Sequence, residues 1–289
     1  MGSNKSEKID EGNKHKPKQN QTQPQNSDAK KRKRKEFAVF GNYRNYYGYR
    51  IGKNIDEDPR LKVMKKEWFE GKDCLDIGCN TGVVTTDIAI KFSCRSILGI
   101  DIDGDRIKDA HWHLRNIMNK KNRSKATPKQ TPIDLEKDGK VDEIEGELNE
   151  NPEELKDLFN VVSFEKGNIA QGWRPPANTK YHVILCLSVT KWVHLNWGDD
   201  GIITLFSKVW SHLHPGGVFI VEPQPWISYS KNRVVSETAT VNYQKIKIRP
   251  EDFQDILLDK IGFRTVENIA SRVSGSTAGF ERPILALWK

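Results

Sequence analysis

A glycine-rich turn between a short apolar strand and an amphipathic helix most constrains what this chain can fold into. A strand is predicted over residues 73–79, the turn DIGCNTG covers residues 76–82, and apolar residues recur at helical spacing over 83–92. Glycines let the backbone of such a turn pass close to a ligand, and the first N–H groups of the next helix point at it. In an open α/β sheet the ligand binds beyond the carboxyl ends of the strands, so this turn marks a candidate ligand site.

Predicted strands and helices alternate along the rest of the chain. This alternation predicts an α/β fold with a mostly parallel central sheet and helices on both faces. Asp199 or Asp200 is available to cap the helix that follows them. The later predicted strands are residues 96–102, 161–164, 181–189, 218–222, 263–269 and 284–288, and the later predicted helices are residues 105–118, residues 201–213 and a helix that begins at Pro250.

Two polar stretches stand apart from this pattern, which predicts a single domain over residues 37–289. Residues 1–36 hold eleven basic and five acidic residues and almost no apolar ones, so we expect a disordered basic tail. Six consecutive basic residues at 30–35 indicate a nuclear protein or an arm that grips nucleic acid, and a merely solvated run is the alternative. Residues from about 119 to 157 are acid-rich and interrupted by prolines, which predicts a disordered insertion.

The composition argues against a membrane or metal protein. No apolar run approaches the roughly 18 residues that span a bilayer, so we expect no membrane partner. The four cysteines include no C-x-x-C pair, and we predict buried thiols rather than a metal site or a disulfide framework. The net charge of +8 instead favours a polyanionic partner such as nucleic acid.

Two further strand ends extend the candidate ligand site. Asp101 ends the second predicted strand in LGIDID, where a carboxylate can accept hydrogen bonds from both hydroxyls of a ribose, and the alternative is an ordinary strand-terminating aspartate. Asn168, in KGNIA, is placed to meet an adenine edge or to form a turn. The turn lacks the G-x-G-x-x-G of nicotinamide sites. Its G-x-N-x-G after an acidic residue resembles the first motif of class I (Rossmann-type) methyltransferases, which implies S-adenosyl-L-methionine as cofactor.

Three unusual segments carry the information on the substrate. CLSVTKWVHLNWGD, residues 186–199, is predicted to start as a buried strand and to end as a polar, aromatic loop; VEPQPW, residues 221–226, ends the next strand. GNYRNYYGYR, residues 41–50, interleaves tyrosines with arginines, a pattern that suits a single-stranded RNA end because rings stack on bases and guanidinium groups bind phosphates. In the alternative interpretation Trp192 and Trp197 are core residues and the tyrosines form a packing lid.

Together these segments resemble the methylphosphate capping enzymes, also called the Bicoid-interacting-protein family. The motifs are NYYGYR, DIGCN, GIDID, CLSVTKWVHLNWGD, HPGG, EPQPW and GFERP, and they span about residues 40–289. The resemblance implies a methyltransferase of class I fold that methylates the terminal γ-phosphate of a 5′-triphosphorylated small nuclear RNA of the 7SK type. It also implies ribonucleoprotein subunits as further partners.

The resemblance implies roles for individual residues. The cofactor residues are Arg60, Gly78 and Asn80 at the methionine end, Asp101 and Ile102 at the ribose and adenine, Asn168 and Ile169 beside the adenine, together with Asp76 and Leu187. The catalytic residues are Lys191, Tyr46 and Arg50, and the substrate-binding residues are Ser188, Thr190, His194, Phe280 and Arg282.

The chemistry requires little beyond placement. A sulfonium methyl is already activated and a terminal phosphate oxygen is already anionic, so in-line alignment and exclusion of water suffice without a strong general base. For that reason we expect His194 and Glu222 to orient other groups rather than to transfer a proton. Three alternatives remain open: a 5′-monophosphate RNA methyltransferase, an RNA-binding scaffold that stabilises a ribonucleoprotein, and a small-molecule methyltransferase.

Overall fold

The computed structural model describes residues 38–47, 57–125, 158–270 and 282–289. They all belong to the larger of two compact units, Phe37–Lys289. The basic tail and most of the acidic insertion lie outside the described residues, so their predicted disorder stays a prediction.

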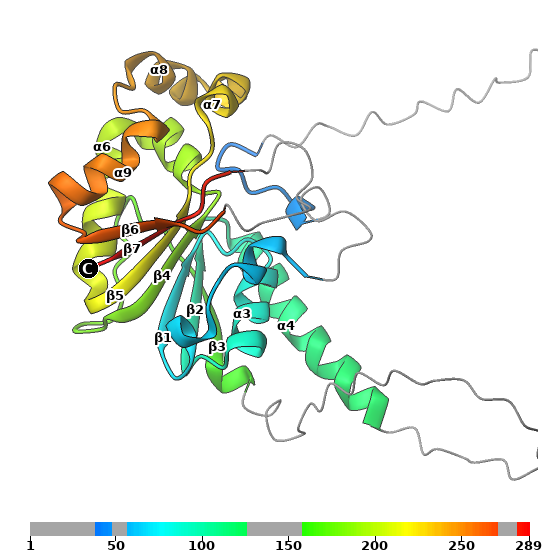
Figure 1. Ribbon diagram of the computed structural model, residues 1–289. Coiled ribbons are helices and arrows are strands. Elements are labelled where there is room, and N and C mark those ends of the chain that lie inside the picture. The colour runs from blue at the N-terminus through cyan, green and yellow to red at the C-terminus, as the bar shows by residue number, and fades with distance from the viewer. Residues whose placement is uncertain (1–37, 48–56, 126–157, 271–281) are drawn as a thin grey trace, which may run out of the picture. The chain divides into compact units, whose positions relative to one another are not determined.

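A seven-stranded sheet forms the centre of this unit (Figure 1). The strand order is β3-β2-β1-β4-β5-β7-β6. The first five strands pair in parallel and β7 runs antiparallel to both β5 and β6, which confirms the predicted mostly parallel α/β sheet. The strands are β1 Asp73–Ile77, β2 Ser96–Asp101, β3 Val162–Lys166, β4 Tyr181–Leu187, β5 Leu213–Glu222, β6 Thr265–Asn268 and β7 Leu285–Trp288.

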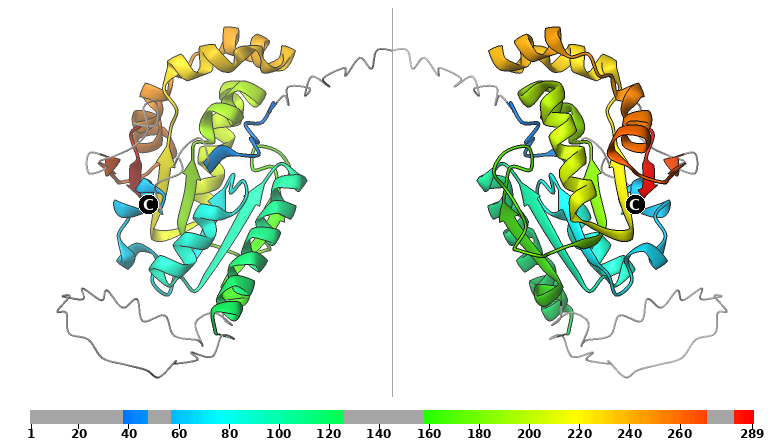
Figure 2. Two further views of the ribbon diagram at one scale, coloured as in Figure 1. Left: turned by 90° about the vertical axis from the view of Figure 1, so that its right-hand side faces the viewer. Right: turned by 90° about the vertical axis from the view of Figure 1, so that its left-hand side faces the viewer.

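Helices cover both faces of the sheet (Figure 2). On one face, α3 and α4 bury residues such as Ile88 and Leu114 with alternate strand residues in one core cluster. On the other face, α6 and α9 bury Phe206 and Phe253 in a second cluster. The helical elements on and around these faces are η1 Pro59–Lys62, α2 Lys66–Phe69, α3 Val83–Phe92, α4 Gly104–Lys125, α6 Thr190–His212 and α9 Phe253–Asp255, the last flanked by η3 Pro250–Asp252 and the π-helical η4 Ile256–Ile261.

Two helices differ from the sequence prediction. Helix α4 continues seven residues beyond the predicted end at Met118, to Lys125. Helix α6 begins at Thr190, so the polar, aromatic segment predicted as a loop is helical, with a kink at Gly198 where the backbone leaves the helical region (φ 64°, ψ −163°). Its polar side chains are satisfied by buried partners, and this is why its composition wrongly indicated a loop. Asp199 was expected as a cap, but it instead binds His194 and the backbone N–H groups of Lys247 and Ile248.

A small helical layer follows β5 and was not predicted. It consists of α7 Trp226–Asn232, η2 Arg233–Val235 and α8 Glu237–Lys245. Tyr229, Ala239 and Ile246 from this layer bury a third cluster with Trp192 and Leu195 of α6. The layer therefore packs on the first half of α6, next to the carboxyl end of β4. None of the described helices is long and apolar enough to cross a membrane.

Candidate active site

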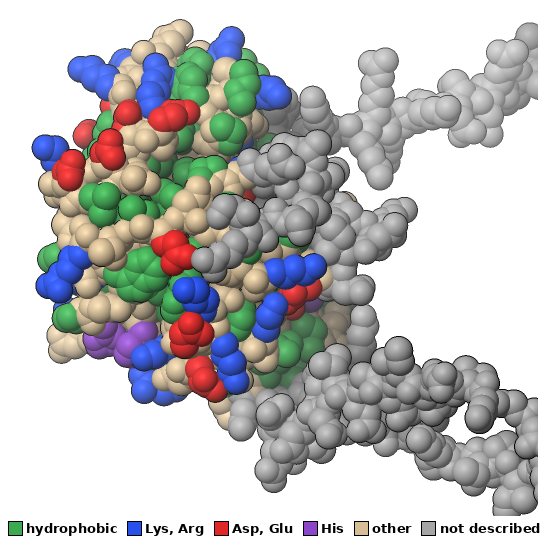
Figure 3. All heavy atoms as spheres, viewed as in Figure 1, with side chains coloured by type: hydrophobic (Ala, Val, Ile, Leu, Met, Phe, Trp, Pro, Cys, Tyr) green, Lys and Arg blue, Asp and Glu red, His purple; other side chains and the backbone are tan. Residues whose placement is uncertain are grey.

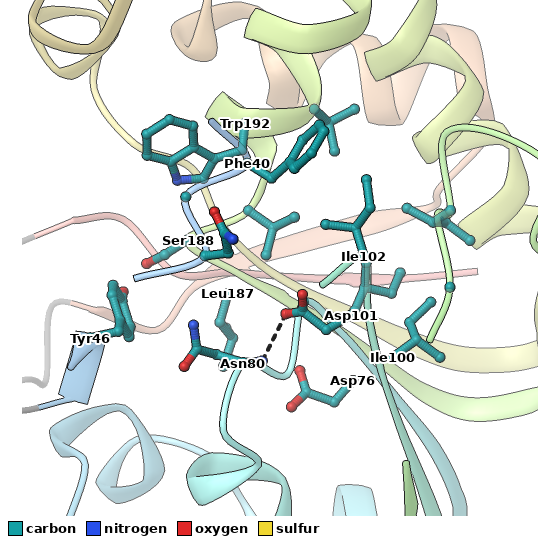
Figure 4. A pocket seen from close by; sticks show the side chains of 18 of the residues that line it. Phe40, Tyr46, Asp76, Asn80, Ile100, Asp101, Ile102, Leu187, Ser188 and Trp192 are labelled. Atoms are coloured by element: carbon teal, nitrogen blue, oxygen red, sulfur yellow. Dashed lines mark hydrogen bonds between the residues drawn. The ribbon is translucent and has the colours of Figure 1, made fainter. Parts of the chain in front are cut away.

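A pocket opens at the carboxyl ends of the parallel strands (Figure 4). Its volume, with the open solvent at its mouth included, is about 870 Å³. We call the ends of β1, β2 and β3 its cofactor side, and the ends of β4 and β5 its substrate side. Nine predicted cofactor residues line it: Arg60, Asp76, Gly78, Asn80, Asp101, Ile102, Asn168, Ile169 and Leu187. The structure therefore brings together all the cofactor residues that the sequence singled out.

The turn after β1 contains three residues with positive φ, Gly78, Asn80 and Gly82. Gly78 has φ 77°, and a Cβ atom there would lie 2.3 Å from Cγ2 of Val189, so only glycine fits. The Gly78 N–H donates to the Ile100 carbonyl at 2.7 Å, which ties the turn to β2. Asn80 has φ 50°, and its amide donates to the Tyr43 carbonyl at 3.2 Å. The turn thus holds the backbone against the pocket and also fixes the segment before it in the chain.

Asp101 stands at the end of β2, as predicted. One carboxylate oxygen accepts the Asn80 N–H at 3.0 Å and the other accepts the Asp103 N–H at 2.9 Å. Burial raises its pKa. Each oxygen keeps lone pairs beyond these backbone bonds, so the carboxylate can still accept hydrogen bonds from the two hydroxyls of a ribose.

Asp76 lies deeper in the pocket and is almost fully buried. The Thr85 hydroxyl donates to it at 2.6 Å. Burial raises the pKa of this carboxyl to about 6. Burial therefore makes the charged form of Asp76 costly, and a polar or cationic ligand group would offset that cost.

Arg60 is held by two carboxylates at the base of the pocket. Its Nε and Nη2 donate to Asp58 at 2.9 and 2.7 Å, and Nη1 donates to Glu222 at 3.0 Å. Burial by itself would lower the pKa of Arg60, but Asp58 and Glu222 raise it well above its usual value. Three of its five N–H groups are used in these bonds, so the guanidinium can still donate to a ligand carboxylate. The cluster carries one more negative than positive charge, which equally suits the ammonium of an amino acid.

Asn168 fits both of its sequence interpretations. It lines the pocket, and its side-chain oxygen accepts the N–H groups of Ala170 and Gln171 at 3.0 and 3.2 Å, which makes a turn. The Lys208 ammonium donates to the Ile169 carbonyl at 2.8 Å and secures the same turn. Ile169, in this turn, and Ile102 both line the pocket and contribute apolar side chains to it.

On the substrate side, Ser188 joins the pocket to a buried charge network. Its φ of 64° is strained for a residue other than glycine. The Ser188 hydroxyl donates to Glu222 at 2.5 Å and accepts from Arg282 Nη1 at 3.0 Å. Since Glu222 also binds Arg60, one continuous network connects the two sides of the pocket.

Lys191 lies one helical turn beyond Ser188 and is buried. Its ammonium donates to the Ser228 hydroxyl at 2.7 Å and lies 4.4 Å from the centre of the Trp192 ring. Burial, with a smaller effect of the Arg282 charge, lowers the pKa of Lys191 to about 7. A bound phosphate would stabilise the charged form, so this lysine is suited to meet an anion.

Four described residues predicted at the RNA end do not line the pocket: Lys191, Arg282, Thr190 and His194. Arg282 reaches the pocket wall through Ser188, and the Lys191 ammonium lies over the ring of Trp192, which does line it. The other two are held within the fold. Thr190 is fully buried, and its hydroxyl donates to Gln224 at 3.1 Å. His194 is also fully buried, with Nε2 2.8 Å from Asp199 and Nδ1 3.4 Å from the Tyr229 hydroxyl. Their prediction as substrate contacts is corrected here: both side chains hold α6 in place, which agrees with the orienting role expected for His194.

The aromatic segment before the turn is described only in part. Tyr46 lines the mouth of the pocket and packs edge-to-face on Tyr47, with 5.3 Å between ring centres (Figure 4). Arg50 and Phe280 lie outside the described residues, so their predicted roles stay predictions. Arg282 is described, and it reaches the pocket wall through Ser188.

Sequence reasoning missed the apolar roof of the pocket. Phe40 stacks on Trp197 with 5.9 Å between ring centres and 11° between planes, and Gly41 lies so close to Trp192 that a Cβ atom would be 2.1 Å from its ring nitrogen. Asn42 donates to Asp103 beyond the end of β2. Trp192 and Trp197 therefore line the pocket as well as packing in the core. The sequence signal that could have revealed this roof was Phe40, the aromatic residue next to Gly41 and just before the tyrosine cluster.

The sequence of this chain is similar to those of several known proteins. The sequence model of the family described as Bicoid-interacting protein 3 matches residues 181–289, which include all of the substrate side. An Arabidopsis thaliana protein named as a probable RNA methyltransferase is 58% identical over 261 residues, which cover 88% of this chain and 82% of that protein. The 7SK snRNA methylphosphate capping enzyme of Homo sapiens is 36% identical over 281 residues, or 86% of this chain and 39% of that protein. The U6 snRNA methylphosphate capping enzyme Amus of Drosophila melanogaster is 34% identical over 248 residues, or 85% of this chain and 73% of that protein.

Proposed function

Because this chain belongs to the Bicoid-interacting protein 3 family of methylphosphate capping enzymes, we propose that it methylates the terminal γ-phosphate of a 5′-triphosphorylated small nuclear RNA. It is a methyltransferase that uses S-adenosyl-L-methionine. One observation carries the choice of a phosphate acceptor: the wall between the cofactor residues and α6 is formed by Ser188, which Arg282 binds, with Lys191 one turn away. The substrate side thus combines two cations with a hydroxyl, which are groups that bind phosphate.

The residues present fit the cofactor. An amino-acid-bearing nucleoside needs a ribose acceptor, an apolar slot for the base and polar groups for the amino acid. Asp101 supplies the first, Ile102 and Ile169 supply the second, and the Arg60 cluster supplies the third. When bound, the cofactor supplies an activated methyl group on sulfur; the protein supplies placement and a dry pocket.

The protein groups around the acceptor act by positioning it. Lys191 and Arg282 hold the phosphate chain, and the Ser188 hydroxyl, whose single O–H donates to Glu222, holds Arg282 in place by accepting its Nη1. The terminal phosphate oxygen is already anionic, so no proton has to be removed. The burial of His194 and Glu222 supports this assignment, because both are used in structural hydrogen bonds.

The described surface favours a grip on the RNA end rather than on a broad groove. On the face that Figure 3 shows, Lys and Arg side chains are interspersed with Asp and Glu side chains. A mixed surface of this kind attracts a polyanion weakly, since long-range attraction follows the net local charge. We therefore assign recognition to Tyr46 at the pocket, to Lys191 and Arg282 next to its lining residues Trp192 and Ser188, and to Arg50 and Phe280 from the resemblance. We assign further attraction, and a nuclear location, to the basic run at residues 30–35. Ribonucleoprotein subunits as partners are part of the same proposal.

Methyl transfer to RNAs that differ only at the 5′ end tests the proposal. Tritiated S-adenosyl-L-methionine is offered with one RNA hairpin bearing three phosphates, one phosphate or a hydroxyl. We expect label on the triphosphate RNA and none on the hydroxyl RNA. The label should resist a phosphomonoesterase, because the terminal phosphate is then a methyl ester, and should be released by a pyrophosphatase that cleaves the phosphoanhydride. Preference for the monophosphate would instead support the sister activity. Label on neither, with RNA binding retained, would support the scaffold alternative and overturn the proposed function.

A further inference from the structure

The EPQPW motif at the end of β5 has a structural consequence at the substrate side. Pro223 and Pro225 flank Gln224, whose side chain is 2% exposed and does not line the pocket. A buried primary amide has two donors and two acceptor positions, so its partners are informative. All of its described partners belong to the four-residue turn Ser188–Lys191, which connects β4 to α6.

The Gln224 amide binds this turn at three points. Its oxygen accepts the Lys191 N–H at 3.0 Å and the Thr190 hydroxyl at 3.1 Å. Its nitrogen donates to the Ser188 carbonyl. A single side chain thereby holds both ends of the turn.

These contacts replace a helix cap that the local sequence does not provide. The residue at the N-cap of α6 is Val189, which cannot accept a hydrogen bond through its side chain. The first N–H groups of a helix need an acceptor, and Gln224, 33 residues further along the chain, supplies one to Lys191. The same amide restrains Ser188, whose φ of 64° is costly unless the surroundings fix it.

Glu222 and Gln224 bind different groups of Ser188. The Glu222 carboxylate accepts the Ser188 hydroxyl and its carbonyl accepts the Ser188 N–H at 3.1 Å, whereas Gln224 holds the Ser188 carbonyl. Glu222 also binds Arg60 and so belongs to the cofactor cluster. Gln224 makes no contact of that kind, so its effect on the reaction must pass through Ser188 and Lys191.

We propose that Gln224 is a positioning residue for methyl transfer, which sets the places of the Ser188 hydroxyl and the Lys191 ammonium relative to the cofactor pocket. This inference rests on the proposed function, because it assumes that Lys191, and Arg282 held by the Ser188 hydroxyl, meet the RNA phosphate. It predicts that loss of the amide lowers turnover while cofactor affinity is unchanged.

The test compares Gln224→Met, which removes all three hydrogen bonds at similar volume, with Gln224→Glu, which keeps an acceptor for Lys191 and Thr190 but loses the donor to Ser188. Gln244→Met, at an exposed position on α8, is the matched control. We expect kcat on triphosphate RNA to fall about 10- to 100-fold for Met and less for Glu. Cofactor Kd by calorimetry should stay within about twofold of wild type for both, and the control should match wild type in both measurements.

A double-mutant cycle separates positioning from general destabilisation. If Gln224 acts through Lys191, adding Gln224→Met to Lys191→Ala should reduce single-turnover rates by less than about threefold further, because the group to be positioned is already gone. Full additivity, a kcat within twofold of wild type, or a parallel loss of cofactor affinity would each overturn the inference. Inactivity of the wild-type protein on triphosphate RNA would instead overturn the proposed function, so the two failures are distinguishable.

Discussion

The two sides of the pocket are held in place by contacts of different range. On the cofactor side, Asp101 accepts the N–H of Asp103 two residues on, and Asn168 accepts that of Ala170. On the substrate side, Glu222 reaches back 34 residues to the hydroxyl of Ser188 and 162 residues to Arg60. The cofactor side therefore combines local turns with contacts between separate segments, such as the Asn80 N–H on Asp101 21 residues away, whereas the substrate side depends mainly on contacts that form only when distant segments pack.

This difference predicts how the two sides respond to substitution. Residues more than about 7–10 Å apart with no shared partner usually behave independently, whereas members of one hydrogen-bond network do not. A change in the local turns should alter cofactor affinity and leave the RNA end unaffected. A change in the long-range network should alter turnover and, where it spares Arg60, leave cofactor affinity unaffected.

The largest effect is expected for Lys191→Ala. The substitution removes the buried ammonium next to Ser228 and leaves every cofactor-lining residue in place. Removing one preorganised charge-stabilising donor typically costs about 10²–10³ in kcat, and we expect a loss of that size on triphosphate RNA. Single-turnover methyl transfer measures the loss, and calorimetry with S-adenosyl-L-methionine should give a Kd within about twofold of wild type.

Lys245→Ala, at an exposed position on α8, is the control for Lys191→Ala and should leave both quantities unchanged. If cofactor affinity falls in parallel with turnover in Lys191→Ala, the two sides are coupled and the comparison above fails. If neither quantity changes, Lys191 is not at the RNA end.

The next effect is a gain in stability from Asp76→Asn on the cofactor side. Burial raises the pKa of Asp76 to about 6, above the ordinary value of 3.8, so the folded protein binds its proton more tightly than the unfolded chain. The tighter proton binding therefore contributes to the stability of the folded protein below about pH 4, and this contribution is lost as the pH rises through about 6. At pH 7.5 the cofactor-free variant should therefore be more stable than wild type by about 1–3 kcal/mol, since one pKa unit corresponds to about 1.4 kcal/mol.

Urea unfolding without cofactor at pH 4 and pH 7.5 measures this gain. Asn can still accept the Thr85 hydroxyl, so the fold loses no bond there. The difference between variant and wild type should appear at pH 7.5 and be small at pH 4. Asp259→Asn, at an exposed position, is the matched control. An equal difference at both pH values would mean that the charge of Asp76 is not its cause.

How much of the site could be predicted from the sequence follows from the same difference in range. Asp76, Gly78, Asn80 and Asp101 were found because a strand end and its following turn are contiguous in sequence, and so were the strands that carry them. The first half of α6 was predicted as a loop because its polar residues bind partners that the local sequence does not reveal, such as Gln224, 34 residues from Thr190, and Asp199, on the other side of the Gly198 kink from His194. The layer α7–α8 was missed for a related reason, since its residues are buried only against that half of α6.

A smaller effect is expected for Asp101→Asn. Its two oxygens accept the N–H groups of Asn80 and Asp103, and an amide has only one oxygen with which to accept them. A hydrogen bond to a charged group contributes about 1.5–3 kcal/mol, so the Kd for S-adenosyl-L-methionine should rise about 10- to 100-fold. At saturating cofactor, kcat should fall less than about threefold, because the substrate side is unchanged. If kcat at saturating cofactor falls by as large a factor as the affinity does, Asp101 also positions the RNA end. Asp255→Asn, on the exposed side of α9, is the matched control.

The smallest effect is expected for Phe40→Ala, which tests the one place where the two sides share a roof. Phe40 is 39% exposed and stacks on Trp197 of α6 over the pocket, so truncation removes a stacked pair and part of the cover. Such pairs contribute about 0.5–1.5 kcal/mol beyond their buried area, which corresponds to a rise in cofactor Kd of about 3- to 10-fold. Phe159→Ala, also at an exposed phenylalanine, should change nothing. Because Trp197 belongs to α6, stopped-flow binding is the informative measurement: a faster dissociation of cofactor at unchanged kcat assigns the roof to the cofactor side. A loss of kcat at unchanged affinity would assign it to the substrate side and move the boundary between the two sides.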